Sequence, residues 1–193
     1  MDFALKGALD RPKALEIRPV QYEIRAHPGR DGGIRKSGPE ILALERRRFS
    51  HALLILDFEG SGTDLANGKD LEARLDERLS RVWNAQAKAI VIEPELDVWV
   101  WGSDNAIGDV IRWPSGKTIR EWLLEQGFQF TSNGKPERPK EALESLLREQ
   151  KVPRSSALYQ DIARKISLRK CKDEAFQRLR RQLVAWFSPS GRA

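Results

Sequence analysis

The stretch Ala52-Leu-Leu-Ile-Leu-Asp57-Phe-Glu59-Gly-Ser-Gly-Thr63 decides the fold class, because an unbroken apolar run leads directly into a polar, glycine-rich loop. The apolar run of residues 52–56 is too short for a stable helix, and its character is typical of a strand buried on both faces of a parallel sheet. Residues 87–92 form a second, similar run, and the leucines of residues 69–83 between the two fall on one helical stripe. Strand, helix and strand at this spacing predict a βαβ unit.

The segments on either side of this unit differ in character. Beyond Trp101 the sequence predicts helices only, over residues 103–111, 117–125, 139–149, 155–166 and 172–187. Before the unit, alternating apolar residues predict a strand over residues 17–26, and four glycines predict a loop over residues 27–38. A helix is expected to begin near Pro39, because proline is tolerated at the first helical position. The predicted fold class is therefore α/β, a mostly parallel sheet flanked by helices and followed by an all-helical extension.

Composition excludes several classes of protein. The chain has 193 residues, of which 40% are apolar and 32% charged, which argues against a disordered chain. No apolar run exceeds five residues, whereas a membrane-spanning helix needs roughly 18, and the charges among the first twenty residues exclude a signal-peptide core. A single cysteine and two histidines exclude a disulfide framework and a cysteine-based zinc site. We expect a cytoplasmic protein without a membrane segment, whose chemistry depends on carboxylates, lysines and arginines.

Positive charge is concentrated toward the C-terminal end of the sequence. The net charge of the whole chain is +6, but residues 135–193 hold 15 Lys and Arg against 7 Asp and Glu, a net of +8. Residues 1–134 hold 19 against 21, a net of −2. This asymmetry predicts an α/β core over residues 1–134, a basic helical extension over residues 135–187 and a flexible tail over residues 188–193. Such a basic surface indicates a polyanionic partner such as nucleic acid, although a solvated helical face has the same composition.

Five residues of the basic part are candidate nucleic-acid contacts, since they lie at or near predicted helix starts, where backbone N–H groups and nearby cations bind phosphate. They are Lys135, Lys140, Arg154, Ser155 and Ser156. For Ser155 the alternative is a plain N-cap of the helix that follows. The glycine-rich sequence Gly29-Arg-Asp-Gly-Gly33 offers a similar choice between a phosphate-binding loop and a simple connector.

Acidic side chains follow both predicted strands. Asp57 and Glu59 end the first strand, and three acids end the second, Glu93, Glu95 and Asp97. Open parallel sheets bind ligands outside the carboxyl ends of their strands, and a one-residue gap on an extended strand end points Asp57 and Glu59 the same way. Crowded carboxylates repel unless a cation neutralises them, and oxygen-only ligands suit Mg²⁺ or Mn²⁺. The five carboxylates are thus the predicted metal ligands, with Asp57, Glu59 and Glu95 as the catalytic set. The alternative is that Asp57 or Glu93 caps the next helix.

These motifs resemble those of a known family. The run that ends in Asp57-Phe-Glu59-Gly is similar to the second motif of TOPRIM-type domains, an apolar strand that ends in Asp-x-Asp. The segment Ile92-Glu-Pro-Glu-Leu-Asp-Val-Trp99 resembles a stretch of small TOPRIM-like proteins related to nucleases of the OLD type. The resemblance is stronger to a component of bacterial methylation-associated anti-phage defence systems. The stretches that carry it span about residues 28–187: GRDGG, DFEGSG, EPELDVWVW, the Pro-Lys-Glu-Ala helix start at residues 139–142, and Arg154-Ser-Ser-Ala-Leu-Tyr159.

The resemblance implies a TOPRIM-like α/β fold and a metal-dependent nuclease role inside a multi-protein defence complex. Two departures from the family bear on catalysis: no acidic strand end precedes residue 52, and Glu59 stands where the family has aspartate. Three functions therefore stay open at this point. They are a Mg²⁺- or Mn²⁺-dependent nuclease that acts on phosphodiesters, a catalytically inactive binding or assembly subunit of the defence complex, and a plain DNA-binding module.

Overall fold

The chain divides into two compact units. The computed structural model describes residues 2–114, 116–166, 168–171 and 173–189. One unit, here called the βαβ unit, is Glu23–Leu96, and the other, the helical unit, combines Met1–Tyr22 with Asp97–Ala193. The boundary expected at residue 134 falls inside the helical unit, because helices before and after that residue share one apolar core. From residue 190 onward, the predicted tail lies outside the described residues.

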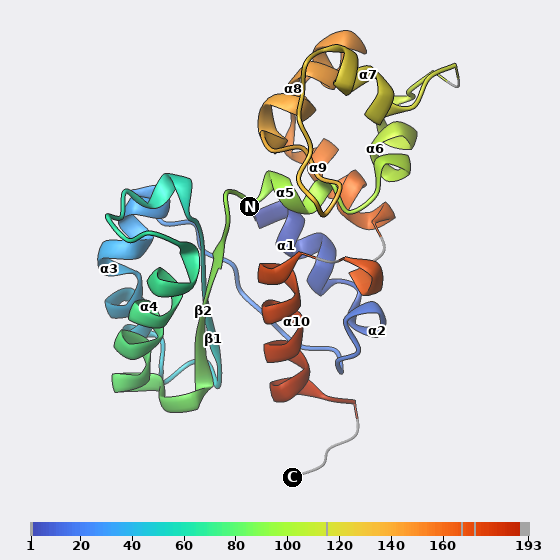
Figure 1. Ribbon diagram of the computed structural model, residues 1–193. Helices are drawn as coiled ribbons and strands as arrows, with labels where there is room; N and C mark the ends of the chain where they lie inside the picture. The colour runs from blue at the N-terminus through green and yellow to red at the C-terminus, as the bar shows by residue number, and fades with distance from the viewer. Residues whose placement is uncertain (1, 115, 167, 172, 190–193) are drawn as a thin grey trace. The chain divides into compact units, whose positions relative to one another are not determined.

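The βαβ unit is built as the sequence predicts. Strands β1 (Ala52–Asp57) and β2 (Ala87–Ile92) pair in parallel, with Ala52 opposite Ala87 and Asp57 opposite Ile92. Helix α4 (Gly68–Trp83) and a short 3-10 helix η2 (Asn84–Gln86) connect the strands, and helix α3 (Arg30–Leu44) precedes β1. In Figure 1 both α3 and α4 lie on the same side of the two strands. The α/β class with a parallel sheet flanked by helices is therefore confirmed, and the sheet of the described residues has two strands.

The core of this unit joins leucines spaced four residues apart on α4 to alternate residues of β1. Leu71, Leu75 and Leu79 of α4 are each 1% exposed, because a spacing of four residues places them on one helical stripe. They pack against the buried positions of β1, Leu54 and Leu56, which alternate with half-buried residues. The strand thus buries one face fully, rather than both faces as the unbroken apolar run suggested.

The segment before β1 differs from expectation in two places. Residues 17–26 have no regular structure, because their alternating pattern finds no neighbouring strand among the described residues. Helix α3 begins at Arg30, so the expected loop of residues 27–38 is largely helical and Pro39 lies inside the helix. The glycines serve close packing rather than a loop. A Cβ atom on Gly38 would lie 2.6 Å from Leu54 Cδ1, so only glycine lets α3 approach β1 this closely.

A guanidinium from α4 compensates for the proline in α3. Pro39 has no N–H group, so the carbonyl of Arg35, four residues earlier, lacks its helical partner. Arg78 of α4 donates from Nη1 to this carbonyl at 2.7 Å and from Nη2 to the carbonyl of Lys36 at 2.6 Å. Nη2 also lies 2.6 Å from Glu40 Oε2. Arg78 therefore satisfies the Arg35 carbonyl, which the proline would otherwise leave without a donor, and adds a bond to the Lys36 carbonyl.

Replacing Arg78 by methionine should lower the free energy of unfolding by about 1–3 kcal/mol, because carbonyl groups lose charged donors. Urea denaturation followed by circular dichroism measures this loss. Arg81→Met is the matched control on the same helix, since Arg81 is 69% exposed and its guanidinium lies 3.3 Å from the exposed Glu77. The control should change stability by less than about 0.5 kcal/mol. Equal effects of the two variants would contradict the role given to Arg78.

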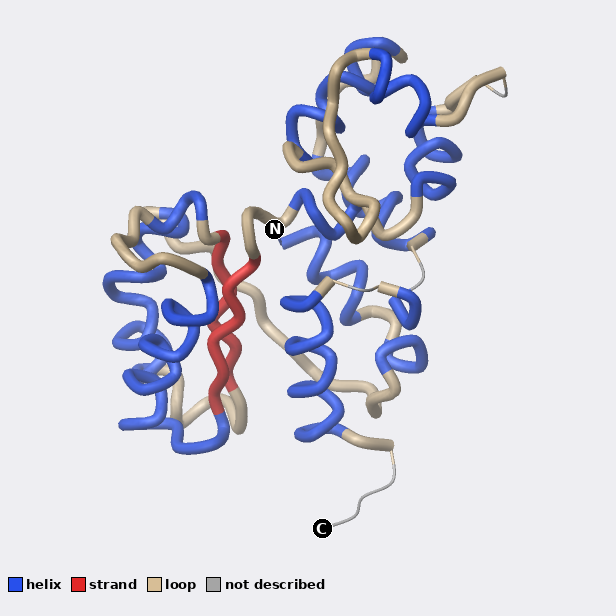
Figure 2. Tube along the Cα trace, in the orientation of Figure 1, coloured by secondary structure: helices blue, strands red, loops and turns tan. Residues whose placement is uncertain are grey.

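The helical unit contains the remaining elements. These are α1 (Asp2–Leu9), α2 (Pro12–Leu15), α5 (Asp97–Val100), α6 (Asp104–Ile111), α7 (Ile119–Glu125), α8 (Pro139–Glu149), α9 (Ser156–Lys165), η3 (Leu168–Lys170) and α10 (Glu174–Phe187). The helices predicted beyond Trp101 are confirmed, and Figure 2 shows this unit as helices and loops without a strand. Ile107, Leu123, Leu143 and Leu146 are fully buried in its main core.

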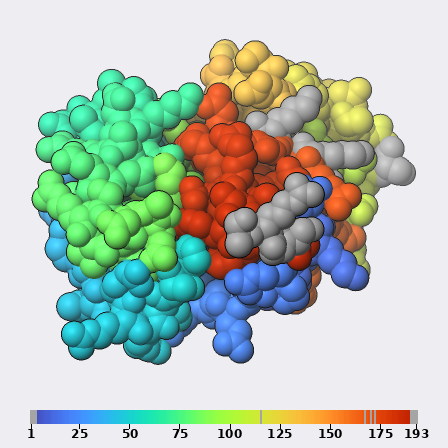
Figure 3. All heavy atoms as spheres, turned by 90° about the horizontal axis from the view of Figure 1, so that it is seen from below, coloured from blue at the N-terminus to red at the C-terminus, as the bar shows by residue number. Residues whose placement is uncertain are grey.

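The segment of residues 16–18 contacts α10 within the helical unit. In Figure 3 the blue atoms of the N-terminal segment lie beside the red atoms of α10. The backbone N–H of Arg18 donates to the carbonyl of Phe187 at 2.8 Å, and the Arg180 guanidinium pairs with Glu16. In the part of the chain that the structure describes, no helix is both long and apolar enough to cross a membrane.

Candidate functional site

Among the predicted site residues, Asp57 has the most strongly shifted pKa. It ends β1, and its Oδ1 accepts a hydrogen bond from the Leu96 N–H at 2.9 Å. Burial raises the pKa of Asp57 to about 7; the charges of Asp31 and Glu95 add to the rise, and the Leu96 N–H opposes it. Three carboxylates therefore act on one another at the carboxyl ends of the strands, where the sequence predicts a site.

Asp31 is the member of this group that the sequence did not reveal. It lies in the first turn of α3, and its Oδ1 accepts a hydrogen bond from the Asp57 N–H at 3.0 Å. A Cβ atom on Gly60 would lie 2.7 Å from Asp31 Oδ2. The glycine therefore leaves room for the Asp31 carboxylate beside the loop that follows β1. GRDGG is thus not a simple connector, because Gly29 is the N-cap of α3 and the next four residues begin that helix. In the sequence, the one sign of this role was the acidic residue Asp31 inside the GRDGG motif.

Glu59 does not share an extended backbone with Asp57. The strand ends at Asp57, Phe58 has helical backbone angles (φ −65°, ψ −49°), and Glu59 begins the 3-10 helix η1 (Glu59–Ser61). The alternation that would point both side chains the same way therefore stops one residue too early. The Glu59 side chain is exposed. The expectation that the two carboxylates point together from one strand end is wrong for this reason.

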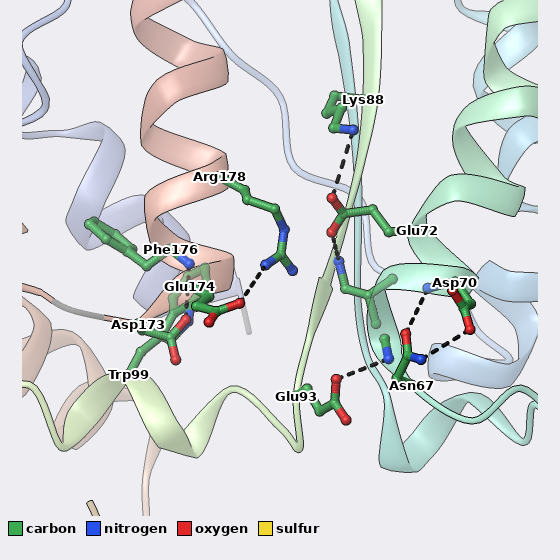
Figure 4. Close-up of polar contacts among 12 residues, drawn as sticks. Asn67, Asp70, Glu72, Lys88, Glu93, Trp99, Asp173, Glu174, Phe176 and Arg178 are labelled. Atoms are coloured by element: carbon green, nitrogen blue, oxygen red, sulfur yellow. Dashed lines mark hydrogen bonds and ion pairs between the residues drawn. The ribbon is translucent and has the colours of Figure 1, made fainter. Parts of the chain in front are cut away.

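Glu93 caps a helix. Its Oε2 accepts a hydrogen bond at 2.9 Å from the N–H of Gly68, the first residue of α4 (Figure 4). The N-cap Asn67 binds the N–H of Asp70 at 2.9 Å, so two donors of the first turn are satisfied. A Cβ atom on Gly68 would lie 2.9 Å from Glu93 Oε2, and glycine is therefore needed at this position for the close approach. Of the two alternatives for Glu93, the helix cap is the one that the structure contains.

Glu93→Ala should lower the free energy of unfolding by about 0.5–2 kcal/mol, because an N–H at the start of α4 loses its anionic acceptor. Glu93→Gln retains an acceptor oxygen and should lose less. Glu59→Ala removes an exposed carboxylate from the neighbouring loop and serves as the control, with a change within about 0.5 kcal/mol. Urea denaturation compares the three variants. A Glu93→Ala protein as stable as the control would show that the cap contributes nothing.

Asp97 belongs to the helical unit and is bound there. Tyr159 donates its hydroxyl to Asp97 Oδ1 at 2.6 Å, and Arg154 Nη2 lies 3.3 Å from the same oxygen. Burial and this hydrogen bond raise the pKa of Tyr159. Arg154 also contacts Glu144 at 2.5 Å, and its guanidinium lies over the Tyr159 ring. One network thus engages both a predicted metal ligand and a predicted nucleic-acid contact.

The other predicted nucleic-acid contacts have mixed placements. Lys135 is 9% exposed, and its Nζ lies 3.2 Å from Asp173 Oδ2, so this cation faces the interior. Ser155 is the N-cap of α9 and accepts from the Leu158 N–H at 3.2 Å, which confirms the capping alternative. Ser156 is the exposed first residue of α9, and Lys140 lies in the first turn of α8. The five residues do not form one common surface feature.

A second buried polar group surrounds Asp173. Its Oδ1 accepts hydrogen bonds from Trp99 Nε1 at 2.9 Å and from the Phe176 N–H at 3.0 Å, and Figure 4 shows these side chains together. With Lys135 on Oδ2, one carboxylate satisfies three donors from three segments of the helical unit. This arrangement is typical of a structural centre that fixes the start of α10, rather than of a ligand site.

The five predicted ligands do not form one metal site. Glu93 and Asp97 accept hydrogen bonds from protein donors, and Glu59 lies beyond the end of the strand. Asp57 likewise accepts from the Leu96 N–H, and the charges of Asp31 and Glu95 help to raise its pKa. Among the described residues, no group of three or more His, Cys, Asp or Glu side chains is arranged to hold a metal ion. Binding of Mg²⁺ or Mn²⁺ by these carboxylates stays a prediction.

Comparison with protein-family models, with curated proteins and with solved structures gave no match to this chain.

Proposed function

We propose that this chain is a nucleic-acid-binding component of a bacterial anti-phage defence system, in which a TOPRIM-like βαβ unit serves binding and assembly rather than catalysis. The observation that carries the proposal is the use of Glu93 and Asp97, two predicted metal ligands, as acceptors for donors of the protein itself. These bonds hold both carboxylates in place without a metal ion, which favours a structural use of the two side chains.

The motifs behind the family resemblance have a structural use that supports this proposal. Arg35 of α3 donates from Nε to the carbonyl of Ser61 at 2.8 Å, so the helix that begins in GRDGG is fastened to the DFEGSG loop. Asp31 and Gly60 make the second contact between the two motifs. Residues that would surround a catalytic metal in a nuclease thus join α3 to the end of β1. Such a rigid edge suits a docking surface for partner proteins of the defence system.

The charge distribution supports the nucleic-acid part of the proposal. Residues 135–193 carry a net charge of +8, and we propose that they form a basic helical extension. Binding driven by phosphate contacts weakens steeply with salt, because counterions are released from the nucleic acid. We place the protein in the cytoplasm, where phage nucleic acid and the other defence proteins meet.

Affinity purification from cells that carry the whole defence system tests the assembly role. A tagged wild-type chain should co-purify with partner proteins, and the Asp57→Asn chain should retrieve the same partners in the same amounts. The purified chain should also bind nucleic acid with an affinity that falls by at least tenfold between 50 and 200 mM salt. A wild-type chain that purifies alone and binds no nucleic acid would refute the proposal.

A second candidate function is Mg²⁺- or Mn²⁺-dependent phosphodiester cleavage, and the raised pKa of Asp57 favours it. Repulsion by Asp31 and Glu95 contributes to that rise, and a divalent cation would relieve the repulsion. In this reading Asp57, Glu95 and Asp31 would hold the ion, with Glu59 near.

Mn²⁺ titration calorimetry, with Asp57→Asn as the matched variant, decides between the two candidates. The assembly proposal expects no saturable heat from either protein. Micromolar binding that Asp57→Asn abolishes would support the nuclease, especially if the assembled defence complex also nicks supercoiled plasmid with wild-type Asp57 only. Intact plasmid under both conditions would exclude cleavage of that substrate.

A further inference from the structure

A short hairpin between α7 and α8 carries two phenylalanines. The Thr131 N–H donates to the Lys135 carbonyl at 2.8 Å and the Glu137 N–H to the Gln129 carbonyl at 3.0 Å, so the chain folds back on itself. An antiparallel bridge joins residues 130 and 136, and Figure 2 shows this connection as a long tan loop. Phe128 and Phe130 are both half-buried and pack against the main core of the helical unit.

An arginine covers each of these rings. Arg120 of α7 places its Cζ 4.3 Å from the ring centroid of Phe130, and Arg138 places its Cζ 5.3 Å from that of Phe128. Arg120 also donates to the Gly134 carbonyl at 3.2 Å. Both arginines are exposed, and within the described part of the chain neither forms an ion pair with a carboxylate. Two guanidinium planes are thus held in place by aromatic rings, and the charge of Arg120 also acts on Asp104, where it opposes the rise in pKa caused by burial.

The surroundings extend this aromatic and basic character. Trp122 of α7 packs edge-to-face on Trp113, with ring centroids 5.4 Å apart. Residues 112–140 carry six lysines and arginines against three glutamates, a net charge of +3. Two of the three glutamates have fixed partners, Glu121 in the capping box of α7 and Glu125 with Lys117. The third, Glu137, lies in the hairpin itself and is exposed.

We propose that this arginine–aromatic face, made of Arg120, Phe128, Phe130 and Arg138, binds single-stranded nucleic acid. The inference rests on the proposed nucleic-acid-binding function and names the class of nucleic acid and its place. Guanidinium planes and aromatic rings stack on unpaired bases, while the same guanidinium groups donate to phosphates. A duplex hides its base faces inside the stack, so it would use the charges alone.

Fluorescence anisotropy of the full chain with labelled 20-nucleotide oligo-dT, and with a 20-base-pair duplex, tests this inference at several salt concentrations. The wild-type chain should bind the single strand at least tenfold more tightly than the duplex. Arg120→Gln with Arg138→Gln should weaken single-strand binding at least tenfold and reduce the slope of log affinity against log salt by about 1.4. Arg120→Lys with Arg138→Lys keeps the charges but loses the planar groups, and should weaken binding about threefold.

The matched control is Arg48→Gln with Arg81→Gln in the βαβ unit, which removes the same charge from residues that contact Glu45 and Glu77. It should change single-strand affinity by less than about twofold. Melting curves for all variants establish that each is folded. Equal loss in the control, or a duplex bound as tightly as the single strand, would overturn the inference while nucleic-acid binding itself survives. A wild-type chain that binds neither probe would instead overturn the proposed function.

Discussion

Replacing Asp57 by asparagine is expected to stabilise the protein at pH 8 by about 1–4 kcal/mol and to leave it nearly unchanged near pH 4. The pKa of Asp57 is raised to about 7 in the folded chain, whereas an unfolded aspartate titrates near 3.9. Folding therefore favours the protonated form, and its contribution to stability is fully present below pH 4. It is lost as the pH rises toward 7, because only the unfolded carboxyl has released its proton in that window. Asparagine is neutral throughout and keeps an oxygen for the Leu96 N–H.

Urea denaturation at pH 4, 6 and 8 measures this difference directly. Asp10→Asn, at an exposed position in the helical unit, is a control whose pH dependence should match the wild type apart from its surface contact with Tyr22. An Asp57→Asn chain that is no more stable than the wild type at pH 8 would show that the crowding of Asp31, Asp57 and Glu95 has no energetic cost. Addition of Mn²⁺ separates the two candidate functions, because only a cation site would let the metal stabilise the wild type and not the variant.

Asp173→Ala is expected to lower the free energy of unfolding by about 3–5 kcal/mol. The substitution leaves the Lys135 ammonium group, 11% exposed, without its anionic partner and removes the acceptor of Trp99 Nε1. It also removes the N-cap of α10, whose Phe176 N–H then has no acceptor. Lys135→Met is the matched variant, because it removes the buried cation and leaves Asp173 with its two N–H donors; it should cost less, about 1–2 kcal/mol.

Thermal and urea denaturation of the two variants test this order. A loss below about 1 kcal/mol for Asp173→Ala, or a larger loss for Lys135→Met, would contradict the account of Asp173 as the centre of the group. Lys135→Met should also bind oligo-dT as the wild type does, because the Lys135 side chain faces the interior. Reduced binding by a well-folded Lys135→Met chain would restore Lys135 as a nucleic-acid contact.

The parts of the fold that the sequence predicted correctly depend on short-range patterns. The leucine stripe of α4 and the two apolar strands carry their own periodicity, so the βαβ unit was accessible without knowledge of its neighbours. Helix α3 could not be predicted in this way, because glycines favour a loop in sequence analysis and only the packing explains their place in a helix. Gly38 lies against Leu54, and a Cβ atom on Gly33 would fall 2.3 Å from the His27 ring. Glycine is required at these positions by tertiary contacts, so the positions follow no periodic pattern in the sequence.

As with the fold, the sequence predicted some features of the candidate site and missed those that depend on tertiary contacts. The position of Asp57 at the end of a strand followed from the strand itself, and the capping alternative for Glu93 followed from the dipole of the next helix. Asp31 was missed because its place beside Asp57 depends on α3. Asp97 follows Glu95 closely in sequence, yet it belongs to another compact unit, and sequence proximity gave no sign of that boundary.

The bond between Arg78 and the carbonyls of α3 has a consequence for how this sequence can evolve. A chain with alanine at position 39 regains the backbone N–H and no longer needs a guanidinium at position 78, whereas a chain that keeps proline must keep the donor. The two positions are therefore expected to covary among descendants of this sequence, with loss of the arginine tolerated only after loss of the proline. In a double-mutant cycle the same dependence emerges as a coupling energy, which makes the pair a marker of shared ancestry where general similarity has faded.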